Sequence, residues 1–148
     1  MNKKLLIGVL AMALCINLSA QDHRLFFASS EGDVDKVTQL LAEGVDVNAA
    51  MPGGFSPLMY ATQYGKTQVM TALIKAGASI NLTDGSGNTA LMIAVMRDDL
   101  QAVKILLAAD ARLDTKNNND LDAVEIARIR NREAILSLLE AHRARKGS

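Results

Sequence analysis

The chain has few of the residues on which catalytic and redox chemistry depends. Among its 148 residues it has one cysteine, no tryptophan, no glycine-rich phosphate loop and two histidines, His23 and His142, near opposite ends of the region after residue 20. Histidines placed in this way are typical of a helix cap and a tail residue rather than of catalytic partners. The sequence therefore indicates that the protein is not an enzyme, and it predicts no catalytic residue, metal site or cofactor.

Aromatic residues are also few, and the formal net charge is zero. Aromatic side chains make up 3% of the chain, and its 16 basic and 16 acidic residues cancel. A chain of this length and balance suits one soluble domain without a bias toward nucleic acid. Arg128, Arg130 and Arg132 form a local basic group, but Glu125 and Glu133 are interleaved with them, which favours a solvated surface over a phosphate or nucleic-acid site.

The first twenty residues have the layout of a secretory signal peptide. Two lysines precede an apolar run at residues 5–16, and a polar step then ends at Ala20. The run is short for a permanent helix across a hydrocarbon layer of about 30 Å, so we expect cleavage after Ala20. Cleavage would leave 14 basic and 16 acidic residues and no cysteine. The short basic start is typical of bacteria and predicts a periplasmic location. An uncleaved membrane anchor or a buried core helix is the alternative to a signal peptide.

The rest of the sequence repeats itself with a period of 33 residues. Four apolar columns share this period, which indicates stacked supersecondary units, each too small to bury its own apolar face. The columns are Ala28, Ala61, Ala94 and Ala127; Leu25, Leu58, Leu91 and Val124; Leu40, Leu73, Leu106 and Leu139; and Val37, Met70, Val103 and Leu136.

Residues that begin and end helices recur with the same period. Two columns hold residue types that can adopt the left-handed conformation after a helix, namely Gly32, Gly65, Asp98 and Asn131, and Gly44, Gly77 and Asp110. Ser56, Thr89 and Asp122 stand where an N-cap would accept a hydrogen bond, and Pro57 follows at the first helical position. Each unit is thus predicted to contain a turn, a short helix, a tight turn and a longer helix. The last unit lacks the second stop, so its final helix is expected to run into the tail.

These motifs resemble the ankyrin repeat, a 33-residue unit with the signature TPLHxA. The matching segments are SPLMYA at 56–61, TALMIA at 89–94 and, more weakly, DAVEIA at 122–127. The resemblance implies an all-α ankyrin-repeat solenoid of four helix-turn-helix repeats joined by β-hairpin or turn loops. It divides the chain into a signal peptide at 1–20 and an ankyrin-repeat domain at 21–148, with repeats at about 22–50, 51–83, 84–116 and 117–143.

The signature histidine is replaced by Met59, Met92 and Glu125. Hydrogen bonds that such a histidine could make between loop and helix are therefore expected to be missing in at least two units, with more mobile hairpins as a consequence. Simple apolar filling by methionine is the alternative. The segment DGSGN at 84–88 lacks the bidentate glutamate of a calcium loop and falls at a hairpin tip, so it predicts a turn.

Ankyrin-like stacks usually bind partners through the hairpin tips and the inner end of the first helix, and the resemblance carries this face over to the present chain. Aromatic, methionine and arginine side chains are common interface anchors. The residues expected to bind a partner are Met51, Phe55, Gln63, Tyr64, Ser86, Asn88, Met96, Arg97, Asn118, Leu121 and Arg130, flanked by Ala50, Pro52, Gly53, Thr83, Lys116 and Ile129. Alternatively, Phe55 folds over the neighbouring hairpin and Tyr64 covers a helix end.

The resemblance also implies a class of function. We expect a small monomeric periplasmic protein that binds another protein, an envelope enzyme, and masks or regulates it in the manner of a self-protection antidote. Nucleic acid, cofactors and membrane insertion of the mature chain are not expected. Two alternatives stay open: support for an oxidant-defence enzyme such as a periplasmic catalase, and a secreted effector that binds a host protein.

Overall fold

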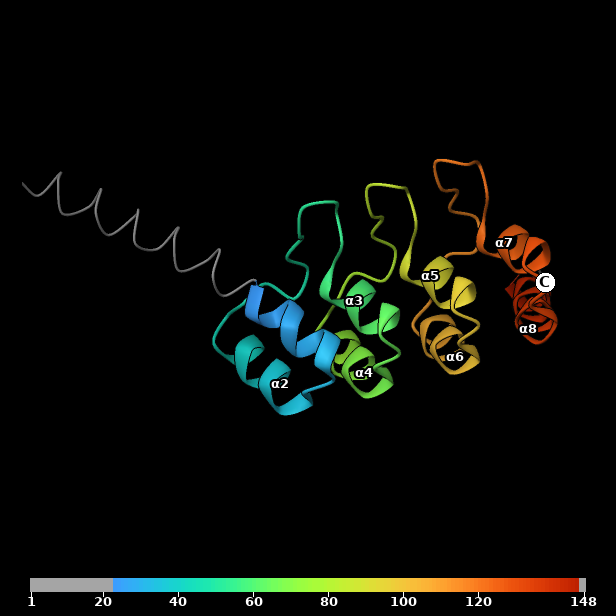
Figure 1. Ribbon diagram of the computed structural model, residues 1–148. Helices are drawn as coiled ribbons and strands as arrows, with labels where there is room; N and C mark the ends of the chain where they lie inside the picture. Colours follow the sequence, from blue (N-terminus) through green and yellow to red (C-terminus); the bar gives the residue numbers. More distant parts are fainter. Residues whose placement is uncertain (1–22, 147–148) are drawn as a thin grey trace, which may run out of the picture.

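The structure is a row of helix pairs stacked along the chain (Figure 1). The computed structural model describes residues 23–146, so the predicted signal peptide at 1–20 lies outside the described residues. No strand occurs between residues 23 and 146, and the expected all-α solenoid is confirmed. A helical segment at 23–31 precedes α2 (Val34–Ala42), α3 (Pro57–Gln63), α4 (Thr67–Lys75), α5 (Ala90–Met96), α6 (Leu100–Ala108), α7 (Ala123–Ile129) and α8 (Glu133–Lys146).

The helices form two layers. In one layer α3 contacts α5 and α5 contacts α7; in the other α2, α4, α6 and α8 contact one another in sequence, and α3, α5 and α7 each pack on the helix that follows. The hairpin loops rise together on the side of α3, α5 and α7 (Figure 1). Within the described range no helix has the length and apolar content needed to cross a membrane.

The repeated apolar columns become the layers of the core. Leu40, Leu73, Leu106 and Leu139 are all fully buried, which is the arrangement expected when each helix pair covers the apolar face of the next. One column breaks at its end, because Leu136 is only half-buried whereas its equivalents are fully buried. Leu136 lies on α8 in the last unit, whose outer side is covered by no further helix pair.

Left-handed residues end the helices where the sequence predicts them. The predicted helix-ending residues all have positive φ angles, from 54° at Asn131 to 90° at Gly77. At the last repeat, where the second stop is missing, α8 continues for 14 residues, compared with 9 in α4 and α6. The prediction that the final helix runs into the tail is therefore confirmed.

The N-caps of the short helices are also confirmed, and they correct one expectation. The side chains of Ser56, Thr89 and Asp122 each accept a hydrogen bond from the backbone amide three residues later. In return, the Met59 Sδ accepts from the Ser56 amide at 3.5 Å and a Glu125 carboxylate oxygen accepts from the Asp122 amide at 2.8 Å. The expected loss of hydrogen bonding is thus wrong at Met59, because its thioether completes the cap.

The position before the second helix serves as a side-chain cap in α2 and α6 but not in α4. Asp33 and Asp99 cap α2 and α6 through their side chains, whereas Lys66, which precedes α4 with similar backbone angles (φ −88°, ψ 71°), makes no such hydrogen bond. Lys66→Asp is expected to raise the free energy of unfolding by about 0.5–1 kcal/mol, because an aspartate there would satisfy a free amide of the first turn. Urea unfolding measures the change, with Lys66→Ala as the uncapped reference. A variant no more stable than Lys66→Ala would contradict the prediction.

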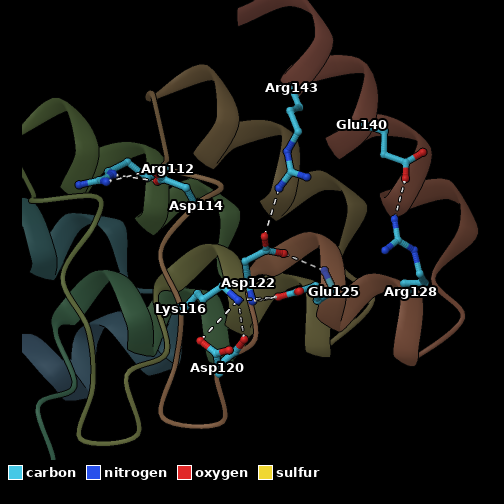
Figure 2. A network of polar contacts seen from close by, with 9 residues as sticks. All are labelled: Arg112, Asp114, Lys116, Asp120, Asp122, Glu125, Arg128, Glu140 and Arg143. Carbon is cyan, nitrogen blue, oxygen red and sulfur yellow. Dashed lines mark hydrogen bonds and ion pairs between the residues drawn. The ribbon is translucent and has the colours of Figure 1, made fainter. Parts of the chain in front are cut away.

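The carboxy-terminal end carries a set of charged side chains that join loop and helices (Figure 2). Its ion pairs include Arg112–Asp114 at 3.0 Å, Lys116–Asp120 at 3.4 Å, Arg128–Glu140 at 3.1 Å and Arg143–Asp122 at 3.1 Å. The hydrogen bond from Arg112 lowers the pKa of Asp114, and that from Lys146 lowers the pKa of Asp110. Exposed pairs add little stability, so their main consequence is a polar end to the open stack.

Candidate partner-binding face

The face expected to bind a partner is formed by three hairpin tips and the carboxy-terminal ends of α3, α5 and α7. We call this surface the inner face and define its tips as residues 51–55, 84–88 and 117–121. The first and last residue of each tip are joined by one backbone hydrogen bond of 3.0 Å, from Met51 to Phe55 in the first tip and at the equivalent positions in the other two. The expected hairpins are therefore tight loops rather than strand pairs.

Side chains fix the shape of the second and third tips. A carboxylate oxygen of Asp84 accepts hydrogen bonds from the amides of Ser86 and Asn88, at 2.8 and 2.9 Å. The side-chain oxygen of Asn117 does the same for Asn119 and Leu121. These are Asx turns, so the turn predicted for 84–88 is confirmed. No group of histidine, cysteine or acidic residues between 23 and 146 is arranged to hold a metal ion.

Neighbouring tips are bonded to one another. The Gly85 amide donates to the Gly53 carbonyl at 2.6 Å, and the Asn118 amide donates to the Ser86 carbonyl at 2.9 Å. The Asn118 side chain adds a hydrogen bond to the Gly85 carbonyl at 3.1 Å. The three tips thus form one hydrogen-bonded row, which limits the conformational entropy that they would lose on binding.

Two of the predicted binding residues have structural partners within this row. The Asn88 side chain accepts a hydrogen bond from the Asn117 side chain at 2.9 Å, and Asn88 is only partly exposed. The Asn118 side chain is exposed but is used for the contact to Gly85. Both residues hold the tips in place, a role that the sequence analysis did not assign to them.

The aromatic residues gather at the amino-terminal part of the inner face. The ring of Tyr60 lies edge-on to Phe26 and Phe55, at centroid distances of 5.1 and 5.6 Å, and stacks on Tyr64 at 6.3 Å. Phe55 is half-buried and packs against the core, whereas 54% of Tyr64 stays exposed. Phe55 therefore packs on the core, and Tyr64 is an exposed ring of this cluster.

The carboxy-terminal part of the inner face differs from the aromatic part. Here a cavity of about 180 Å³ lies between the third tip and α7, lined by Met96, Asn117, Asn119, Leu121, Ile126, Ile129 and Arg130. Ile129 is 64% exposed beside it. The structure brings together Met96, Leu121 and Arg130 from the predicted set. The sequence analysis did not single out Ile126, Asn117 or Asn119, although their equivalents 33 residues earlier occupy the preceding tip and helix.

The remaining predicted residues differ in exposure. Gln63, Ser86 and Arg97 are exposed, whereas Met51 is partly buried at the base of the first tip. Their part in binding stays a prediction, and the geometry shows only that Gln63 and Arg97 lie at the ends of α3 and α5, close to Tyr64 and Met96 respectively.

A family model for ankyrin repeats (three copies) matches residues 25–120 and, in a second alignment, residues 58–147. The chain belongs to the ankyrin-repeat family. The comparison with curated protein sequences gave no match. Ankyrin repeats are protein–protein interaction modules and are typically not enzymes, so the membership indicates a protein partner. The hydrogen-bonded tips and exposed side chains of this ankyrin-repeat protein are the features available to such a partner.

Proposed function

We propose that this ankyrin-repeat protein acts in the periplasm, after cleavage behind Ala20, where it binds an envelope enzyme and masks its active cleft. The observation that carries the proposal is the exposure of two large apolar side chains, Tyr64 and Ile129, on one preorganised face. Exposed apolar groups on a soluble domain mark interaction sites when they form part of a shared surface. Tyr64 directly follows α3 and Ile129 ends α7, so both lie at the carboxy-terminal ends of short helices of the same layer.

The proposed mechanism is steric. A standard interface buries about 800 Å² on each partner, which is more than one repeat can supply, so the inner face would have to engage across several units. The linked tips present that surface without a large ordering cost. The ring of Tyr64, held by its stacking on Tyr60, would act as an anchor, since hot spots are enriched in tyrosine and arginine.

Tyr64→Ala is expected to weaken binding of the captured envelope enzyme by at least about 2 kcal/mol, because it removes an exposed anchor that the core does not need. Wild-type protein is used to capture the partner from an envelope extract, after which calorimetry gives the Kd and an activity assay measures inhibition of the enzyme. Inhibition should fall in parallel with affinity. Phe55→Ala is not a clean probe, because Phe55 also packs on the core.

Two variants provide the controls. Tyr64→Phe keeps the stacked ring and should bind within a few-fold of wild type, while Lys104→Ala alters an exposed side chain on α6, in the other helix layer, and should leave binding unchanged. Equal affinities for Tyr64→Ala and wild type would refute the inner face as the binding site. A captured enzyme that is stabilised rather than inhibited would refute masking and favour a supporting role.

A further inference from the structure

Each tip of the inner face lies beside the end of a short helix, and we call each such place a junction. The three junctions occupy equivalent positions in the repeat but carry different side chains. At the last junction the cavity is lined by Met96, Leu121 and Ile129. The residues 33 positions earlier are Gln63, Asn88 and Met96, and Asn88 is occupied by its hydrogen bond to Asn117. The apolar part of this cavity lining therefore comes from residues particular to the last junction and not from the repeat itself.

Two arginines occupy equivalent positions at the ends of adjacent helices. Arg130 lines the cavity, whereas the guanidinium of Arg97 lies beside Gly65 of the preceding repeat. Arg97 follows α5 and Arg130 follows α7, and both are exposed. Neither side chain forms a hydrogen bond or ion pair with any residue of the described part of the chain, whereas nearby Arg128 and Arg132 are paired with Glu140 and Asp98. Arg145, at the end of α8, is the one other arginine between residues 23 and 146 without such a partner.

The acidic residues near these two arginines also have other partners. The carboxylate of Asp99 lies beside Gly65, as the Arg97 guanidinium does, and its other oxygen caps α6 through the Ala102 amide. Asp98, the acidic residue next to Arg97 in sequence, is 3.2 Å from the guanidinium of Arg132. Glu125, on α7, lies 3.8 Å from the ammonium of Lys116 and caps its own helix. Neighbouring helices pack about 8–10 Å apart, so an extended segment of a few residues spans the distance between the ends of α5 and α7.

We propose that this junction binds an acidic protein segment in which an aliphatic side chain is flanked by aspartate or glutamate. The aliphatic group enters the cavity beside Met96 and Ile129, and the carboxylates pair with Arg97 and Arg130. The cavity volume of about 180 Å³ lies well below the 300–1,000 Å³ of typical small-molecule sites, which favours a single side chain of a protein segment as the occupant. Arginine forms bidentate pairs with carboxylates, which fixes the register of the segment. This inference rests on the proposed function of the inner face.

A random twelve-residue peptide library displayed on phage tests the proposal against the purified protein. The enriched peptides should contain a leucine, isoleucine, valine or methionine with aspartate or glutamate within two positions on either side. Their affinity should fall at least ten-fold for Arg97→Gln/Arg130→Gln and should weaken as salt concentration rises. Ile129→Asp, which places a carboxylate at an exposed site beside the cavity, should repel the same peptides.

The double variant Lys104→Gln/Arg145→Gln is the control, because it removes the same charge from exposed positions on α6 and α8 and should leave peptide affinity unchanged. Enriched peptides without an acidic excess, or acidic peptides that bind the Arg97/Arg130 variant as well as wild type, would overturn the proposed chemistry. If those peptides nevertheless lose affinity with Tyr64→Ala, the inner face still binds protein and this inference alone fails. A library that gives no enrichment also counts against it.

Discussion

Replacement of Leu106 by alanine is expected to lower the free energy of unfolding by about 3 kcal/mol. Leu106 is fully buried in α6, and its column of equivalent leucines passes through the middle of the stack. Truncation there removes apolar contacts and leaves a cavity that rigid helices on both sides cannot fill. Since α6 contacts both α4 and α8, the loss should weaken two interfaces between helix pairs at once.

Urea unfolding of Leu106→Ala and wild type measures this difference. Leu82→Ala is the matched control, because the same side-chain atoms are removed from a loop position that is 37% exposed, and its effect should stay within about 0.5 kcal/mol. If the two variants lost similar stability, α6 would not be held by the buried leucine column, and the fully packed stack described above would be wrong.

The success of the sequence analysis for the fold has a physical reason. A repeat places similar residue types at the same structural position four times. A residue's weak preference for burial, capping or a helix end therefore becomes a strong signal when the four equivalent positions are compared. Asp98 and Asn131 illustrate this, since neither is a reliable helix stop alone, but both share a column with Gly32 and Gly65 and all four have positive φ. The caps at Ser56, Thr89 and Asp122 were predictable for the same reason.

The candidate site was harder to predict, because its geometry depends on differences between repeats. Phe55 and Tyr64 look alike in the sequence as aromatic residues near a helix end. Both rings contact Tyr60 in the structure, but Phe55 packs on the core whereas 54% of Tyr64 stays exposed. The contact between Asn88 and Asn117 joins tips 29 residues apart and has no counterpart with the same side chains at the first tip. A contact between two side chains that does not recur every 33 residues cannot be detected in a single sequence.

Gly87→Ala is expected to destabilise the protein by about 3 kcal/mol and to separate the second and third tips. Gly87 has a φ of 76°, where alanine is strained by about 1–2 kcal/mol. A Cβ at this position would also lie 2.8 Å from the Asn118 side-chain oxygen and 3.0 Å from backbone atoms of Asn117 and Asn118. These atoms belong to the row of linked tips, so relief of the contact requires movement of the third tip and adds about 1–3 kcal/mol of overpacking.

Gly77→Ala separates the two contributions. Gly77 has a φ of 90°, but a Cβ there would meet no atom within 4 Å, so this variant should lose only the conformational part, about 1–2 kcal/mol. Amide hydrogen exchange provides the second measurement: the Asn118 amide, which donates to the Ser86 carbonyl, should lose protection in Gly87→Ala and keep it in Gly77→Ala. Because residues of the third tip line the cavity beside Arg130, partner affinity should fall with the same variant. Equal losses of stability, with Asn118 protected in both, would mean that the tips move independently and that the inner face is not preorganised.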